Sequence, residues 1–479
     1  MQTSLRGQSM NSSLREAAPG PRLKSFRSVE TEMASGLRQS VRFAPFTRVM
    51  TLLAALGSPV FFAAAAAAGY TYAGSESSAV YVVYSLSVAL LALTVCVVGV
   101  VLNRRRYPLA AWIAGMIPLL VGVAYFAVGD GGADSSSASP MFRNFLVWAV
   151  PAFYVGLYTG AAGKWRQTAR LLDPLMMLFS VASIGSVVGF AFGGLATRGI
   201  GGATYQTLSY TSALAFGLNI HLLLDRGKVR RYAIANHKTY RLVCIVLLPV
   251  QVFAVVVSGG RGGVVLIGVY VLQLLLRQRT VGSRLRSASL IVLIAILSVL
   301  LLQLAMPNTA VSQGYERAFA YVSSSGVDWA GTSGRDAVYS RALALIDQRP
   351  GLGYGPFGFV DHMAPYVYPH NLFLELLLGG GVVGLMLGVS ALGALRVRYS
   401  RLKQQDDSLG TLGVLATYQI VMLMFSGSYL GAPTLWFTAG LIIAAGHLRL
   451  RQLVGSQAPV GSEVGVAGAS RYSLAAPRR

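Results

Sequence analysis

Long apolar runs recur along most of the chain and are separated by short polar stretches. A helix that crosses the hydrocarbon core of a bilayer needs about 20 predominantly apolar residues. The runs fall at residues 49–69, 78–102, 109–128, 143–163, 173–195, 207–224, 241–258, 262–276, 287–306, 371–395, 409–428 and 433–448. The pattern therefore predicts an all-α integral membrane protein with about 12 transmembrane helices.

The composition supports this prediction. Hydrophobic residues make up 54% of the 479 residues and charged residues only 12%, whereas roughly 25% of a soluble domain is charged. The apolar runs extend over most of the sequence, so the chain is predicted to be one integral membrane domain rather than a soluble enzyme with an anchor.

Charged loops give the predicted orientation. With the N-terminus inside, the loops rich in Lys and Arg all fall on the cytoplasmic side, as the positive-inside rule requires. Only seven of the 40 Lys and Arg then lie outside, and these are Arg143, Arg198, Arg261, Arg317, Arg335, Arg341 and Arg349. Both termini are therefore predicted to be cytoplasmic.

A net charge of +23 would suggest a nucleic-acid partner if the protein were soluble. Here the cations lie next to the inner leaflet, where attraction to anionic lipid accounts for them. We therefore expect membrane lipids, and no nucleic acid, as partners of this surface.

The chain divides into five predicted segments. Between the ninth and tenth helices lies one outer loop of unusual length, which is too rich in Tyr, Phe and Leu for a disordered linker. The segments are a disordered basic cytoplasmic tail (1–48), helices 1–9 (49–306), a large periplasmic loop carrying catalytic residues (307–370), helices 10–12 (371–448) and a cytoplasmic tail (449–479).

All the predicted outer cations are arginines. A guanidinium keeps its charge and can bind two phosphate oxygens at once through its planar fork. Arg261 lies in a glycine-rich turn, residues 258–263 (SGGRGG), where backbone amides and the side chain could converge on an anion. The alternative is that Arg261 only reaches the membrane interface and the glycines only make the turn.

Two further arginines lie in the large loop. If residues 335–341 are helical, Arg335, Tyr339 and Asp336 share one side of the helix. Arg335 and Arg341 are candidates for binding a diphosphate. For Arg341, a place on the solvated face of an amphipathic helix is an equal alternative.

His370 and Asn371 lie where the large loop enters a long apolar run. An imidazole titrating near pH 6.5 at the membrane boundary is a natural general base. A capping or hydrogen-bonding role is the more common use of a single interfacial histidine. Glu375, slightly more than one turn later, requires a polar partner in such apolar surroundings.

These residues belong to a pattern. His370-Asn371, nine residues, and then Gly381-Val382-Val383-Gly384 resembles the H-N-x9-G-x-x-G signature of the O-antigen ligase superfamily. The SGGRGG turn and the segment 350–355 (PGLGYG) come in the same order as in that superfamily. The resemblance covers roughly residues 250–395.

The resemblance implies a metal-independent, inverting transferase that needs no cofactor. In it His370 would activate an acceptor hydroxyl and Arg261, Arg335 and Arg341 would bind the diphosphate. The donor would be a glycan on undecaprenyl diphosphate, and the acceptor lipid A-core or another glycan. The protein would lie in the bacterial inner membrane with its active site facing the periplasm.

Three other functions remain open. A polymerase that joins repeat units on the same carrier and a protein O-oligosaccharyltransferase would share this donor chemistry. A polysaccharide transporter or flippase would also have about twelve helices. The apolar runs, however, lack the charged residues near mid-membrane that coupled transport uses.

Overall fold

The computed structural model describes residues 26–67, 79–103, 109–128, 138–193, 205–224, 237–278, 280–319, 322–323, 326–327 and 335–456. Its contacts divide the chain into two units, Met1–Thr47 and Arg48–Arg479. The candidate site lies within the second unit.

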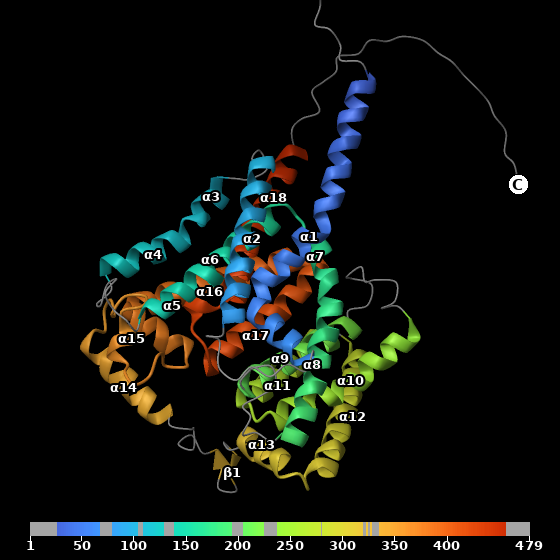
Figure 1. Ribbon diagram of the computed structural model, residues 1–479, viewed down its shortest axis with the longest axis vertical. Coiled ribbons are helices and arrows are strands. Elements are labelled where there is room, and N and C mark those ends of the chain that lie inside the picture. The colour runs from blue at the N-terminus through green and yellow to red at the C-terminus, as the bar shows by residue number, and fades with distance from the viewer. Residues whose placement is uncertain are drawn as a thin grey trace, which may run out of the picture. The chain divides into compact units, whose positions relative to one another are not determined.

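The described residues are helical apart from turns and one short hairpin (Figure 1). The first half contains α1 (Phe26–Ala67), α2 (Ala79–Asn103), α3 (Leu109–Gly115), α4 (Ile117–Val128), α5 (Ala138–Asn144), the π-helical η3 (Phe145–Ala149), α6 (Val150–Ala161), α7 (Trp165–Thr168), η4 (Ala169–Leu171), α8 (Leu172–Gly193) and α9 (Tyr205–Leu224).

The second half contains α10 (Lys238–Val257), α11 (Arg261–Arg277), α12 (Val281–Ala305), α13 (Thr309–Phe319), β1 (Val322–Ser323), β2 (Gly326–Val327), α14 (Arg335–Gln348), α15 (Phe359–His362), α16 (Leu372–Gln405), η8 (Asp407–Leu409), α17 (Gly410–Phe425), η9 (Tyr429–Gly431) and α18 (Pro433–Ser456). The hairpin pairs Val322 with Val327 in an antiparallel register.

Every predicted apolar run is mainly helical where the structure describes it. Eight of the described helical stretches are both long and apolar enough to cross a membrane. The run at 109–128 is broken at Met116 into α3 and α4, and α11 has only 17 residues. The all-helical membrane class is therefore confirmed, and the number of twelve spans remains a prediction.

The N-terminal segment differs from the expectation for residues 1–48. Helix α1 begins at Phe26, so residues 26–48 are helical, and residues 1–25 lie outside the described part. Ala, Arg, Glu, Gln, Leu and Met, the residues that cost least in a helix, together occupy 11 of the 23 positions from 26 to 48. At the other end α18 continues to Ser456, beyond the predicted boundary at 448.

Glycines allow α6 and α18 to approach closely. A methyl group at Gly156 would lie 2.2 Å from the carbonyl oxygen of Phe437, and one at Gly440 would lie 2.3 Å from that of Phe153. Small residues at such positions are typical of helix pairs in membranes, where packing rather than the hydrophobic effect holds helices together.

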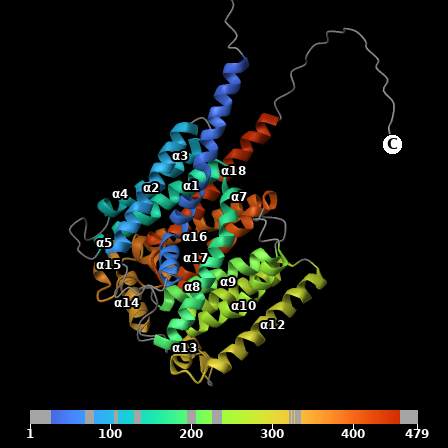
Figure 2. The ribbon, with the colours of Figure 1, turned by 45° about the vertical axis from the view of Figure 1, so that its right-hand side comes forward.

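A second helical group is formed by α8, α9 and α10, which lie side by side with α12 against α10 (Figure 2). Helix α9 is its centre, with nearly all of its side chains buried from Leu208 to Leu223. In the middle of this group the Asn219 amide donates to the Cys244 carbonyl, 2.8 Å away. Helix α9 is therefore a fixed element between the others, and its N-terminal turn reaches the candidate site.

The large loop has its own apolar core. Val338 and Leu345 of α14 pack with Phe357, Phe359 and neighbouring buried side chains. The same cluster includes Phe145 of η3, so the loop is attached to the helices by close packing. This packing fixes the N-terminus of α14, where Arg335 lies.

Candidate functional site

Helix α16 has a sharp break soon after its start. Gly381 has φ +61° and ψ −158°, a conformation that residues with a side chain rarely adopt. A methyl group at Gly384 would lie 3.1 Å from the carbonyl oxygen of Leu376, although eight residues of straight helix would separate them by about 12 Å. The helix after His370 is therefore short, and the long helix expected there begins only at Val382.

The glycine-rich segment 350–355 holds this break in place. The amides of Val382 and Tyr354 donate across the contact, to the Pro350 carbonyl (2.8 Å) and the Leu378 carbonyl (2.8 Å). A methyl group at Gly353 would lie 2.4 Å from the Leu378 oxygen, and one at Gly381 would lie 2.2 Å from the Gly351 oxygen. Gly353 and Gly381, one from each motif segment, are thus required by one backbone-to-backbone contact.

His370 lies just before the short helix in an unusual conformation. Its φ is +53°, a value that Asn, Asp and His tolerate better than other side chains do. Its ring makes an edge contact with Tyr368 at 4.5 Å between centroids. The Nδ1 atom is buried and has no hydrogen-bond partner among the described residues. The ring therefore keeps a nitrogen available for another molecule.

The charge state of His370 is set by its surroundings. Burial, and then the positive charge of Arg335, lower the pKa of His370 from 6.5 to about 4. Both effects disfavour the protonated ring. His370 is accordingly neutral at physiological pH and can accept a proton.

Asn371 acts as the N-cap of α16. Its side-chain oxygen accepts hydrogen bonds from the amides of Phe373 (3.0 Å) and Leu374 (3.3 Å). An N-cap of this kind stabilises the first helical turn. Asn371 thereby fixes the direction in which the chain enters the helix and so the position of His370.

Arg335 begins α14 and lies close enough to His370 for its charge to affect the imidazole. One guanidinium nitrogen donates to the Phe425 carbonyl at the end of α17, 2.7 Å away. The guanidinium carbon also lies 5.9 Å from the centre of the Phe425 ring. The structure therefore brings together two residues that are 35 positions apart in the sequence.

The turn that follows α17, residues 426–429, forms hydrogen bonds with α9 and α16. The sequence pattern did not predict a role for this turn. The hydroxyl of Ser426 donates to the Gln206 side chain of α9 (3.2 Å), and that of Ser428 donates to Glu375. The amide of Tyr429 also donates to Glu375, at 3.2 Å. The requirement of Glu375 for a polar partner was the one signal in the sequence that could have indicated this turn.

Removing the carboxylate of Glu375 should destabilise the protein. Glu375 is 1% exposed, so Glu375→Ala leaves the Ser428 hydroxyl and the Tyr429 amide buried without this acceptor. Each unsatisfied group costs about 1–3 kcal/mol. We expect a lower melting temperature in detergent by tryptophan fluorescence, and no change for the exposed Glu316→Ala. Equal melting temperatures for Glu375→Ala and wild type would contradict this account.

Arg261 starts α11 and lies near the turn that follows α17. Its Nε donates to the carbonyl of Arg317 at 3.0 Å, and the Arg317 guanidinium lies 4.7 Å from the centre of the Tyr205 ring. A methyl group at Gly260 would lie 3.7 Å from the Cα of Gln206, the residue that Ser426 contacts. Arg261 and Arg335 thus flank the same junction of α9, α11 and α17.

Arg341 has a different environment. Its Nε and Nη2 both donate to the carbonyl of His362, at 3.0 and 2.8 Å, and so attach α14 to the end of α15. Residues 335–341 are helical, as the first half of α14. Arg341 stabilises the loop in this structure, and a direct contact of Arg341 with a diphosphate remains a prediction.

The geometry accords with one match among known families. Residues 242–389 match the model of a family described as O-antigen ligase, and no individual curated protein matches the chain. The matched region includes Arg261, Arg335 and His370 together with the contact between residues 350–355 and Gly381. The region that carries these three side chains is therefore similar to the O-antigen ligase family.

Proposed function

We propose that this protein transfers a glycan from undecaprenyl diphosphate to a hydroxyl group of lipid A-core on the periplasmic face of the inner membrane. The observation that carries the proposal is the pairing of a neutral His370, with its buried and unpartnered Nδ1, and the cationic Arg335. A base and a fixed positive charge are the two groups that displacement of a diphosphate requires.

The proposed reaction is a direct displacement at the anomeric carbon. His370 takes the proton of the acceptor hydroxyl as its oxygen attacks the anomeric carbon. The bond from that carbon to the diphosphate breaks, and the electron pair leaves with undecaprenyl diphosphate. Attack opposite the leaving group gives inversion. Arg335, with Arg261 across the junction, stabilises the charge on the departing diphosphate, and no metal ion is invoked.

The placement of the cluster supports a transferase rather than a transporter. Arg261 and His370 stand at the starts of α11 and α16, and Phe425 ends α17, so the cluster lies at one end of these helices. The other ends carry cations such as Arg277 and Arg401. By the positive-inside rule the cluster faces the periplasm.

The pH dependence of the reaction should reflect the low pKa of His370. The base must be neutral, so kcat/KM should stay constant as the pH falls through 6.5 and decline only towards about 4. Arg335→Gln removes the nearby positive charge, which raises the pKa of His370. The decline of kcat/KM on the acid side of the profile should therefore occur at a higher pH. Burial remains the larger effect, so this decline stays below pH 6.5.

This profile is measured as transfer of glycan from a lipid-linked donor in detergent, for wild type, Arg335→Gln and Arg143→Gln. Arg143 is an exposed arginine of α5, and its substitution should leave the decline on the acid side in place. An Arg335→Gln profile that coincides with wild type would show that Arg335 does not act on His370.

The function itself is tested in the bacterial host. We expect that deletion of the gene removes all glycan from lipid A-core on a gel of surface lipopolysaccharide, while undecaprenyl-linked polymer accumulates. Retention of one repeat unit on the core would identify a polymerase instead. An unchanged lipopolysaccharide ladder would direct attention to protein O-glycosylation or another acceptor and would overturn the ligase proposal.

A further inference from the structure

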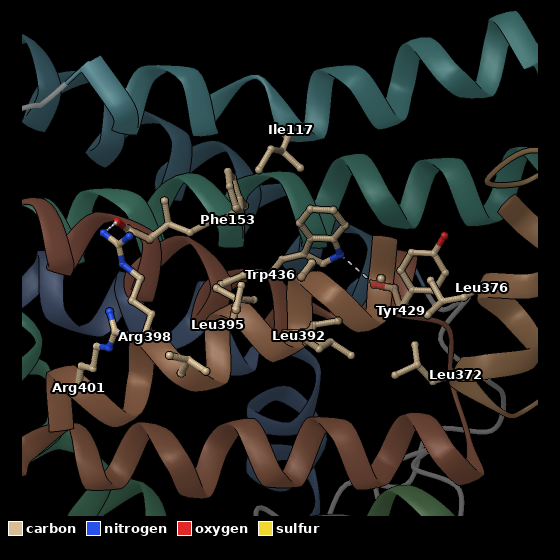
Figure 3. Close-up of a pocket in the computed structure, with 17 residues that line it drawn as sticks. Ile117, Phe153, Leu372, Leu376, Leu392, Leu395, Arg398, Arg401, Tyr429 and Trp436 are labelled. Carbon is tan, nitrogen blue, oxygen red and sulfur yellow. Dashed lines mark hydrogen bonds between the residues drawn. The ribbon is translucent and has the colours of Figure 1, made fainter. Parts of the chain in front are cut away.

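An apolar groove of about 740 Å³ lies between α16 and α18, with Ile117 of α4 and Phe153 of α6 above it (Figure 3). Its walls are aliphatic and aromatic, and Leu392, Leu395 and Trp436 point into it (Figure 3). The volume is within the range of about 300–1,000 Å³ that small-molecule sites occupy.

The two ends of the groove differ in chemistry. One end is formed by Leu372 and Tyr429, next to the candidate site, and the other by Arg398 and Arg401 (Figure 3). From Gly388 to Arg401 the helix extends for about 20 Å at 1.5 Å per residue. The groove is therefore long and apolar, and its cationic end lies far from His370.

The two arginines are arranged to receive an anion. Arg398 donates its Nε and Nη2 to the carbonyls of Ile442 (3.0 Å) and Ile443 (2.8 Å), which fixes its guanidinium against α18. Arg401 is exposed and lies three residues later, on the same side of the helix. No Asp or Glu is among the described residues that line the groove. The cationic end is thus complementary to a phosphate.

We propose that this groove binds an anionic phospholipid from the leaflet opposite the candidate site. Its phosphate lies at Arg401 and the outer nitrogen of Arg398, and one acyl chain follows Leu395 and Leu392 towards Trp436. A cationic residue near an anionic membrane surface contributes about 1 kcal/mol to such binding.

The polyprenyl donor fits this groove less well than a phospholipid does. The donor's diphosphate belongs at Arg335, so a donor tail in the groove would leave Arg398 and Arg401 without an anion. A phospholipid satisfies both ends of the groove, since its apolar chain points towards the candidate site and its charge points away. The bound lipid would stabilise the packing of α16, the helix that positions His370, without taking part in the transfer.

The test uses the full-length protein purified in detergent. Melting temperature and lipid retention in native mass spectrometry are measured with phosphatidylglycerol and with phosphatidylcholine of identical acyl chains. For wild type we expect greater stabilisation and retention with phosphatidylglycerol. Arg401→Gln should weaken the retention of phosphatidylglycerol about fivefold, whereas Arg286→Gln, at an exposed arginine of α12, should not.

A second variant tests the apolar part. Ala391→Trp places a large ring in the groove and should abolish stabilisation by phosphatidylglycerol even though both arginines remain. Equal effects of the two lipids, or no effect of either variant, would overturn the proposal. Stabilisation by undecaprenyl phosphate that depends on Ala391 but not on Arg401 would also overturn it, by identifying a donor-tail site. None of these readouts requires transfer activity, so the result is independent of the proposed function.

Discussion

Glycan transfer should fall by at least about a hundredfold when His370 is replaced by asparagine, while the protein remains folded. Asparagine tolerates the positive φ of this position, +53°, as histidine does. An amide cannot accept the proton of the acceptor hydroxyl, so the chemical step loses its base. The measurement is single-turnover transfer from a lipid-linked donor, which separates chemistry from product release.

The matched control is His362→Asn. His362 also lies in the large loop, and its ring packs against Tyr354 at 4.7 Å rather than at the junction of α9, α11 and α17. We expect near wild-type transfer for this variant. Removal of a general base lowers the rate by about a hundredfold or more. If His370→Asn kept more than about a tenth of the wild-type rate, His370 would therefore not be the base. Its role would then be limited to local structure.

Gly381→Ala should prevent accumulation of stable protein. The side chain would be held at φ +61°, which costs about 1–3 kcal/mol, and its Cβ would lie 2.2 Å from the carbonyl oxygen of Gly351. Relief of the overlap requires the segment 350–355 to move away, which breaks the hydrogen bond between Val382 and Pro350. We expect a strongly reduced yield and a lower melting temperature by fluorescence-detected size exclusion.

Gly380→Ala provides the comparison one residue away. Its φ is not positive and a methyl group there has no neighbour within 4 Å. Alanine is also a better helix former than glycine, so this variant should be as stable as wild type or more so. If both substitutions had the same effect, the break at Gly381 would not be the reason for the glycine in the motif.

Much of the candidate site could be predicted from the sequence. The order of glycines, arginines and the His-Asn pair indicated the resemblance to O-antigen ligases, and the matched family model agrees with it. The turn from Phe425 to Tyr429 could not be predicted in the same way. Its polar groups form hydrogen bonds with Gln206, Glu375 and Arg335, which are distant in the sequence.

The sequence by itself determined the class of the fold. Long apolar runs determine membrane helices because each span satisfies its own backbone hydrogen bonds and depends only on local composition. Tertiary structure alone decided that α16 breaks at Gly381, that the positive charge of Arg335 reaches His370, and that a groove ends at two arginines. These features arise from backbone angles and from contacts between residues far apart in the chain, which no local apolar pattern specifies.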